Sequence, residues 1–352
     1  MNLWRGMIMK AAFFRLPGEV ETRDLPVPVP GAGEVLVRVL ACGICGSDVD
    51  AFRNQQADWH RRGHEYAGEV VQVGEGVNGF RCGDIVAGIG SLPCGECPAC
   101  YRGEPYYCHH PRWFGGDAFA EFVCKSAEFF FPIPHLSPDE GALMEPLTVA
   151  LDLVRDGNVK LGSKVMILGA GPIGLMALKL CCEAGASKIY VSHPSTSTAR
   201  LQLAREWGAD EVLHPDSEDI VKRMKGLEPN GVDCVLVTIT PSIGLPQAVQ
   251  VCSVGGTIAF VGMEWKPQVD IRMNIDEFHF RKLRLVGSNH NPCSRLYPVA
   301  AELLYRKVID AKQLVSHRIP LERIDEAFKL AIEHRDKVRK ILIIQGEANC
   351  DA

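Results

Sequence analysis

The chain has 352 residues, and a single hydrophobic core rarely grows beyond roughly 250–300 residues, so we expect two domains. Hydrophobic residues make up 47% and charged residues 23% of the sequence, a balance that excludes disordered and collagen-like chains. The formal net charge of −5 lacks the basic excess that binding to a nucleic-acid backbone requires, so we expect no nucleic-acid partner.

We find neither an apolar run of about 18 residues nor a secretory signal pattern, and therefore expect a cytoplasmic protein without a membrane span. The chain contains 14 cysteines. In a large chain of this kind, cysteines are expected to remain thiols or to bind metal rather than to form disulfides.

Up to about residue 148 the sequence is rich in Gly and Pro and carries short alternating runs such as 34–40 and 68–73. This pattern predicts irregular antiparallel β structure. From about residue 162 buried apolar runs alternate with helical stretches, which predicts a doubly wound parallel sheet. The six expected strands of that sheet are 164–168, 188–192, 211–213, 234–238, 257–261 and 283–287. Two helices, 296–306 and 324–334, and an apolar strand over 340–345 then end the chain, and we expect this tail to return to the first domain.

Cys94, Cys97, Cys100 and Cys108 form a CxxCxxCx7C array. Four thiolates at this spacing can surround one tetrahedral ion, which predicts a structural zinc site. Four scattered core cysteines or a redox cluster are the alternative interpretations. Because sulfur would fill all four coordination positions, we expect catalysis elsewhere.

A second set of metal-ligand types lies at Cys45, His64, Glu65 and Glu145. A thiolate, an imidazole and a carboxylate suit an open zinc site. Taken singly, each residue has an ordinary interpretation: a core thiol, a histidine in a turn, and acids that cap a helix or form salt bridges. Their separations in sequence do not by themselves identify a site.

The segment from Gly169 to Gly174 reads GxGxxG between a buried strand and a helical run. Its glycines permit a tight turn and close approach to a pyrophosphate, which predicts dinucleotide binding. The next strand ends without the acid that would bind the ribose of NAD, and the loop offers hydroxyls, His193 and Arg200, which slightly favours NADP. Alternatively, Arg200 pairs with a neighbour on a solvated helix face and the hydroxyls only cap that helix.

Together these motifs resemble the zinc-containing medium-chain dehydrogenases, the superfamily of alcohol, sorbitol and threonine dehydrogenases. The resemblance covers essentially the whole chain. It is carried by the four-cysteine lobe and by three further features: the GHE signature with Gly68, Gly74 and Val77, the GICGSD segment at 43–48, and the glycine fingerprint at 169–174.

The resemblance implies an α/β protein with a GroES-like, β-rich catalytic domain over 1–147 and 288–352 and a Rossmann domain over 148–287. The structural zinc lobe would span 94–108. Cys45 and His64 would bind a catalytic zinc ion, and Glu65 is the adjacent acid that can bind zinc or exchange with water. Glu145 stands where classical alcohol dehydrogenases carry a third cysteine, which is similar to the sorbitol and threonine dehydrogenase branch.

Ser47 matches the hydroxyl that relays the substrate proton, whereas Asp50 replaces the histidine that the family often has next in the relay. We therefore place Ser47, Glu65 and Glu145 in the catalytic group. The contacts expected for the dinucleotide are Gly169, Gly171, Ile173, Gly174, Ser192, His193, Arg200, Val261, Ser288 and Arg339.

The expected reaction is hydride transfer between a secondary alcohol, favoured as a sugar alcohol, cyclitol or other polyol, and NAD(P)+. L-Threonine 3-dehydrogenase activity is the nearest enzymatic alternative, and a non-catalytic, zinc-stabilised dinucleotide-binding protein is the alternative from another class. Trp113, Phe114 and Asn289 are candidates for the substrate pocket, with core packing as the competing interpretation. The family also implies a homodimer or homotetramer with one catalytic and one structural zinc ion per subunit.

Overall fold

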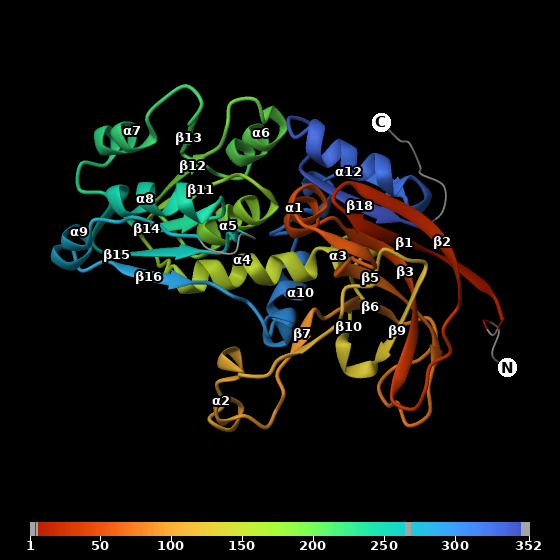
Figure 1. The fold of residues 1–352 in the computed structure, drawn as a ribbon. Helices are drawn as coiled ribbons and strands as arrows, with labels where there is room; N and C mark the ends of the chain where they lie inside the picture. Colours follow the sequence, from red (N-terminus) through yellow and green to blue (C-terminus); the bar gives the residue numbers. More distant parts are fainter. Residues whose placement is uncertain (1–3, 5, 265–268, 346–352) are drawn as a thin grey trace. The chain divides into compact units, whose positions relative to one another are not determined.

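The computed structural model describes residues 4, 6–264 and 269–345. Contacts within the chain divide it into two compact units, Met1–Pro146 with Asn291–Ala352, and Leu147–His290 (Figure 1). These limits lie within a few residues of the expected domain limits. In the described ranges, no helix is both long enough and apolar enough to cross a bilayer.

The first unit is built around a seven-stranded sheet in the order β10-β6-β5-β3-β18-β17, with β9 also paired to β3. A smaller sheet has the order β2-β1-β4, and β7 pairs with β8. The strands are β1 (Ile8–Leu16), β2 (Glu19–Pro26), β3 (Glu34–Gly43), β4 (Ala57–His60), β5 (Glu65–Val73), β6 (Ile85–Gly88), β7 (Ser91–Leu92), β8 (Arg112–Trp113), β9 (Phe122–Ser126), β10 (Phe130–Pro132), β17 (Val315–Pro320) and β18 (Lys340–Ile344).

Short helices connect and cover these strands. Aromatic rings from distant segments form part of the core, with Phe14, Phe52 and Phe119 all packed near Phe328 of the C-terminal segment. The helices are α1 (Gly46–Asn54), α2 (Pro98–Tyr101), α3 (Pro138–Ala142), α10 (Tyr297–Tyr305), α11 (Ala311–Leu314) and α12 (Ile324–Glu333), with 3-10 turns at Pro105–Tyr107, Ala127–Phe129, Ser294–Leu296 and Leu321–Arg323. α4 (Met144–Asp156) begins in the first unit and continues into the second, which starts at Leu147.

The C-terminal strand completes the central sheet of the first unit. β18 runs antiparallel to β3 and parallel to β17, as expected for a tail that returns to the first domain. β3 and β5 are longer than their apolar runs suggested, because β3 continues to Gly43 and β5 begins at Glu65. Glycine and acidic residues are uncommon in strands, yet Gly43 of β3 and Glu65 of β5 are paired across the sheet.

The second unit is a six-stranded parallel sheet in the order β13-β12-β11-β14-β15-β16. Counted along the chain this is 3-2-1-4-5-6, the order of dinucleotide-binding folds, so the predicted doubly wound sheet is confirmed. Its elements are β11 (Lys164–Leu168), α5 (Pro172–Glu183), β12 (Lys188–Ser192), α6 (Thr198–Glu206), β13 (Glu211–Leu213), α7 (Ile220–Leu227), β14 (Val232–Val237), α8 (Pro241–Val251), β15 (Cys252–Phe260), α9 (Ile275–Phe280) and β16 (Arg284–Gly287).

Candidate active site

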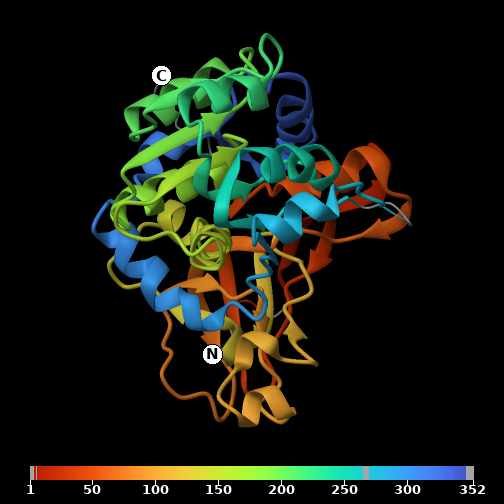
Figure 2. The same ribbon diagram turned by 90° about the vertical axis from the view of Figure 1, so that its left-hand side faces the viewer.

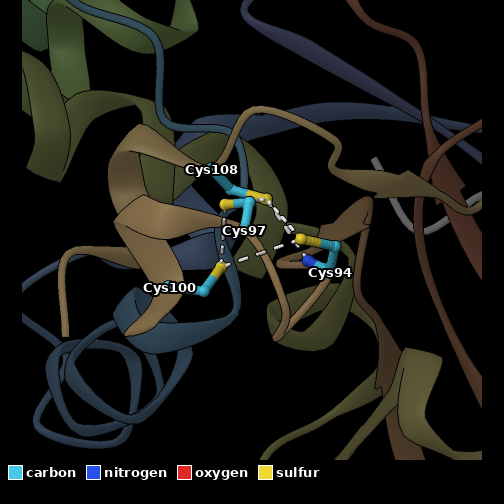
Figure 3. Close-up of side chains that lie close together, drawn as sticks. All are labelled: Cys94, Cys97, Cys100 and Cys108. Carbon is cyan, nitrogen blue, oxygen red and sulfur yellow. Dashed lines mark hydrogen bonds between the residues drawn. The ribbon is translucent and has the colours of Figure 1, made fainter. Parts of the chain in front are cut away.

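The four-cysteine array folds into a lobe around α2, which lies at the end of a loop that extends beyond the strands of the first unit (Figure 2). Four separations between sulfur atoms are 3.5 Å for Cys97–Cys100 and Cys94–Cys108, and 3.9 Å for Cys94–Cys100 and Cys97–Cys108. The four sulfurs therefore converge on one point (Figure 3). A zinc ion with Zn–S bonds of about 2.3 Å has tetrahedral sulfur separations of about 3.8 Å, so this donor set fits zinc.

Backbone amides donate hydrogen bonds to two of these four sulfur atoms. The amide of Cys94 donates to the Cys108 sulfur at 3.3 Å, and the amide of His109 donates to the Cys97 sulfur at 3.5 Å. The His109 contact is the largest of the influences that lower the pKa of Cys97 to about 6. Burial and the neighbouring sulfurs raise the pKa of Cys100 to about 11. Four thiolates can ionise together only if a cation offsets their mutual repulsion.

A second cluster lies where β3, α1 and β5 meet. The ligand atoms of Cys45, His64 and Glu65 all lie within 4.8 Å of one another, the scale of a site for one ion. Cys45 is the N-cap of α1. His64 and Cys45 are half-buried, whereas Glu65 is buried at the start of β5.

Negative charge dominates this second cluster. Burial by itself would lower the pKa of His64, but Cys45, Asp48 and Glu145 raise it well above its ordinary value. Glu145 is buried in the first turn of α4 and is close enough to act on His64 by its charge, although the tight cluster comprises only Cys45, His64 and Glu65. An anionic pocket with sulfur, nitrogen and oxygen donors suits a divalent cation.

The first turn of α1 carries Ser47, the predicted proton-relay residue. Ser47 is half-buried and follows Cys45 by two residues. Asp50 lies on the same helix, where its carboxylate accepts a hydrogen bond from the Asn54 side chain at 2.7 Å.

The expected coenzyme contacts of the second unit gather at one edge of its sheet. They lie at or just after the carboxyl ends of β11, β12, β15 and β16 and in the first turns of α5 and α6, which is where ligands bind such folds. Gly171 is the N-cap of α5. A Cβ atom on Gly174 would lie 1.9 Å from the carbonyl oxygen of Gly169, so the turn closes only because this residue is glycine. This cradle fits the pyrophosphate of a dinucleotide.

Two sequence comparisons match this architecture. Residues 31–135 match the alcohol dehydrogenase GroES-like domain, and residues 172–305 match the zinc-binding dehydrogenase family. The L-threonine 3-dehydrogenase of Pyrococcus furiosus is 34% identical over 322 residues, which cover 88% of this chain and 91% of that protein. The sorbitol dehydrogenase of Bacillus subtilis is 30% identical over 347 residues, or 95% of this chain and 97% of that one.

The chain belongs to the zinc-type alcohol dehydrogenase family. A solved structure of a zinc-binding dehydrogenase from Sinorhizobium meliloti 1021, bound to NADP, agrees with it at a TM-score of 0.84 and 30% identity, covering 96% of this chain and 99% of that one. The predicted resemblance, the GroES-like and Rossmann composition, and the assignment to the zinc-dependent alcohol and polyol dehydrogenases are therefore confirmed.

Some expected coenzyme residues of this zinc-type dehydrogenase have partners within the protein. The Ser288 hydroxyl donates to Asp152 at 3.0 Å, and the ring of His193 accepts from the amide of Ala170 at 3.2 Å. Arg339 belongs to the first unit, apart from the other expected contacts in sequence, and its backbone amide donates to Ser316.

The three candidates for the substrate pocket differ in how far they are exposed to solvent. Phe114 is 3% exposed and packs on Tyr66 with ring centroids 5.0 Å apart, so it is a core residue. Trp113 is 59% exposed, and Asn289 is exposed in the second unit.

Sequence reasoning missed several residues that the fold brings to these sites. Asp48 is buried, and its carboxylate accepts from the amide of Cys45 at 3.1 Å and from Arg62 at 3.0 Å. Its place in the GICGSD segment could have identified it. Lys340, at the start of β18, is buried and contacts Glu65 and the carbonyl oxygen of Ile44. No local pattern marks it, because its partners are far away in sequence.

An acid that the strand-end rule did not find contacts the loop that follows β12. After β13, Asp216 accepts from the amide of Ser195 at 2.9 Å and also binds the Ser195 hydroxyl. These two hydrogen bonds lower the pKa of Asp216 and keep it ionised. The loop after β12 therefore carries a carboxylate that comes from the neighbouring strand.

Proposed function

We propose that the chain oxidises a secondary hydroxyl group of a sugar alcohol, cyclitol or other polyol with NAD(P)+. The balanced reaction converts the secondary alcohol and NAD(P)+ into the corresponding ketone, NAD(P)H and a proton. The observation that carries the proposal is the convergence of a thiol, an imidazole and a carboxylate, from Cys45, His64 and Glu65, within 4.8 Å. Cys45 is the N-cap of α1, and Ser47, a half-buried hydroxyl, lies in the first turn of that helix.

The proposed roles follow from this placement. Zinc held by Cys45, His64 and a carboxylate supplies Lewis acidity, which favours the ionised form of a hydroxyl group. Ser47 accepts a hydrogen bond from the substrate hydroxyl and relays its proton: it takes up that proton while it passes its own hydroxyl proton on toward solvent. Glu65 and Glu145 are the two carboxylates available to the zinc site. In the second unit, the turn from Gly169 to Gly174 binds the pyrophosphate and thereby positions the coenzyme, whose nicotinamide ring supplies the hydride acceptor.

Of the two coenzymes we propose NADP+, because the loop directly after β12 has no acid and offers hydroxyls, His193 and Arg200. Asp216 favours NAD+ instead, because an ionised carboxylate repels the 2′-phosphate of NADP+ and accepts hydrogen bonds from the ribose hydroxyls of NAD+. The ratio of kcat/KM for NADP+ and NAD+ measures this balance. A ratio below one would refute the preference for NADP+ and leave the reaction assignment unchanged.

The substrate class rests on the carboxylate in place of a third cysteine and on the similarity to sorbitol dehydrogenase. Glu145, within Glu-Pro-Leu, supports a polyol over a simple primary alcohol. The second candidate is L-threonine, favoured by the 34% identity to the threonine enzyme of Pyrococcus furiosus over 322 residues.

The test is coenzyme reduction by the zinc-loaded protein with a panel of sugar alcohols, cyclitols, L-threonine and simple alcohols. We expect a zinc-dependent signal with a polyol, two zinc ions per chain, and loss of turnover with an unchanged fold in Cys45→Ala. Cys82→Ala is the matched control, because Cys82 is an exposed thiol outside both clusters. A signal with threonine alone would select the second candidate. Silence across the panel with one zinc ion bound would refute the enzymatic proposal in favour of a non-catalytic, zinc-stabilised protein.

We also propose that the protein forms a homodimer or homotetramer, on the basis of the family resemblance. Light scattering coupled to size-exclusion chromatography measures this directly, and a monomer at micromolar concentration would refute it.

A further inference from the structure

Lys340 is the most deeply buried cation near the proposed zinc ligands among the described residues. Its side chain is 2% exposed, as is that of its ion-pair partner Glu65. Its ammonium group donates to one carboxylate oxygen of Glu65, Oε2, and to the carbonyl oxygen of Ile44 at 3.0 Å. Ile44 directly precedes Cys45. One ammonium group therefore contacts both chain segments that present the proposed zinc ligands.

The register of three strands explains how Lys340 reaches Glu65. Gly43 of β3 lies between β18 and β5, paired with Leu342 on one side and with Glu65 on the other. Lys340 is two residues from Leu342 and so points to the same face of the sheet. A Cβ atom on Gly43 would lie 2.3 Å from Glu65 Oε2 and 2.9 Å from Lys340 Cε. The ion pair thus occupies the space left by the missing side chain of the central strand.

The charges of the site require such a cation. Cys45 as thiolate, Glu65 and Glu145 carry three negative charges, and zinc contributes two positive ones. The excess negative charge would lie in a region where Glu65 is 1% and Glu145 is 7% exposed. The nearby buried charge of Asp48 is already paired with Arg62. An uncompensated charge in such a buried site is strongly unfavourable, and the ammonium group of Lys340 brings the remaining sum to zero.

We propose that Lys340 is a positioning residue of the catalytic zinc site, which fixes Glu65 through Oε2, leaves Oε1 for the metal, and neutralises the donor set. The inference rests on the proposed function, because it assumes that zinc binds at Cys45, His64 and Glu65. Lys340 itself takes no part in the reaction. Its effect is on how tightly zinc is held and on the geometry of its ligands.

The test measures zinc retention against increasing concentrations of a chelator, by elemental analysis of the full-length holoprotein. In Lys340→Met we expect one of the two zinc ions to be lost at a chelator concentration about 10–100-fold lower than in the wild type, the usual size of effects on ligand-orienting partners. The four-cysteine zinc ion is retained and serves as an internal control. Lys329→Met is the matched control variant, because Lys329 is 65% exposed on α12.

A second readout reports ligand geometry. Replacing the chelator-labile zinc with cobalt(II) gives a visible absorption spectrum that depends on the coordinating atoms, and we expect Lys340→Met to change it while Lys329→Met does not. A folded Lys340→Met protein with wild-type zinc retention and an unchanged cobalt spectrum would refute the inference. If the wild type holds only one zinc ion, the proposed function fails as well. If it holds two and the variant holds them equally tightly, only the role of Lys340 fails.

Removing Lys340 alone leaves the charge of Glu65 buried without its partner, so the single variant can fail to fold. The variant Lys340→Met with Glu65→Gln removes both charges and avoids this problem. If Lys340 acts through Glu65, the double variant holds zinc as tightly as Glu65→Gln alone. Independent, additive losses from the two substitutions would show that Lys340 does not act through Glu65 and would refute the proposal.

Discussion

Two glycines of the same turn should respond to alanine in opposite ways. A Cβ atom at Gly174 would lie 1.9 Å from the carbonyl oxygen of Gly169, whereas a Cβ atom at Gly171 meets nothing within 4 Å. Gly171 also has φ −68° and ψ 176°, which alanine adopts without strain. We therefore expect Gly174→Ala to destabilise the second unit and Gly171→Ala to leave its stability nearly unchanged.

The magnitudes follow from these distances. Forcing an extra methyl group into a closed site costs about 1–3 kcal/mol, which for a unit of this size lowers Tm by roughly 2–10 °C. At Gly171, loss of a favourable N-cap residue and the reduced entropy of the unfolded chain are each below about 1 kcal/mol and oppose one another. The methyl group at Gly171 instead occupies space through which the backbone approaches the pyrophosphate. We expect at least about tenfold weaker coenzyme binding, or ~1.4 kcal/mol.

Thermal unfolding with and without NAD(P)H separates the two effects. Gly174→Ala should melt at a lower temperature in the absence of coenzyme. Gly171→Ala should melt like the wild type without coenzyme but gain less from its addition, because ligand stabilisation falls as affinity falls. Equal melting temperatures for wild type and Gly174→Ala would refute the packing argument, and a wild-type coenzyme response in Gly171→Ala would refute the assignment of the pyrophosphate site.

Three other predictions concern separate parts of the molecule. Cys97→Ala should remove one zinc ion and lower the thermal stability of the first unit, because structural zinc contributes directly to folding; two retained zinc ions, measured by elemental analysis, would contradict this. Asp216→Ala should raise the ratio of kcat/KM for NADP+ over NAD+ at pH 7 by about tenfold or more, because it removes a negative charge beside the 2′-phosphate. An unchanged ratio would place Asp216 outside the coenzyme site. Burial raises the pKa of Glu140, but the Lys307 ammonium and the Ser137 cap lower it on balance. Because the folded pKa lies below the unfolded one, Glu140→Gln should be less stable than wild type at neutral pH, by about 1 kcal/mol. This difference in stability should shrink as pH falls through the folded pKa. A difference that does not change with pH in urea unfolding would argue against a stabilising Glu140–Lys307 ion pair.

Much of the second unit could be predicted from the sequence, because each of its strands is a short continuous apolar run with buried faces. The observed bounds of β11, β12 and β13 coincide with the expected ones, and the glycine fingerprint lies at the predicted turn. The four-cysteine lobe was equally accessible, since its donors are close together in the chain and their chemistry is specific.

The residues that could not be predicted make contacts between different segments of the chain. Glu65 and Lys340 are 275 residues apart, and their contact depends on the register of β18 against β3 and of β3 against β5. Asp216 reaches the loop after β12 from the end of a different strand, so a rule that inspects only the residues following β12 overlooks it. Phe114 was ambiguous for another reason: an aromatic side chain near a metal lobe can line a pocket or fill a core, and only its packing on Tyr66 decides between them.

The C-terminal position of β17 and β18 has a consequence for biosynthesis. Residues 147–290 form one continuous unit, which can fold while the rest of the chain is still being translated. The first unit is different, because part of β3 pairs with β18, which follows the whole second unit in the chain. Until β18 is made, residues 41–43 of β3 and the carboxylate of Glu65 lack these partners, although residues 34–38 of β3 can already pair with β9. The nascent chain therefore exposes a short unpaired stretch of strand edge while the second unit is synthesised, and chaperone dependence or aggregation should concentrate in that interval.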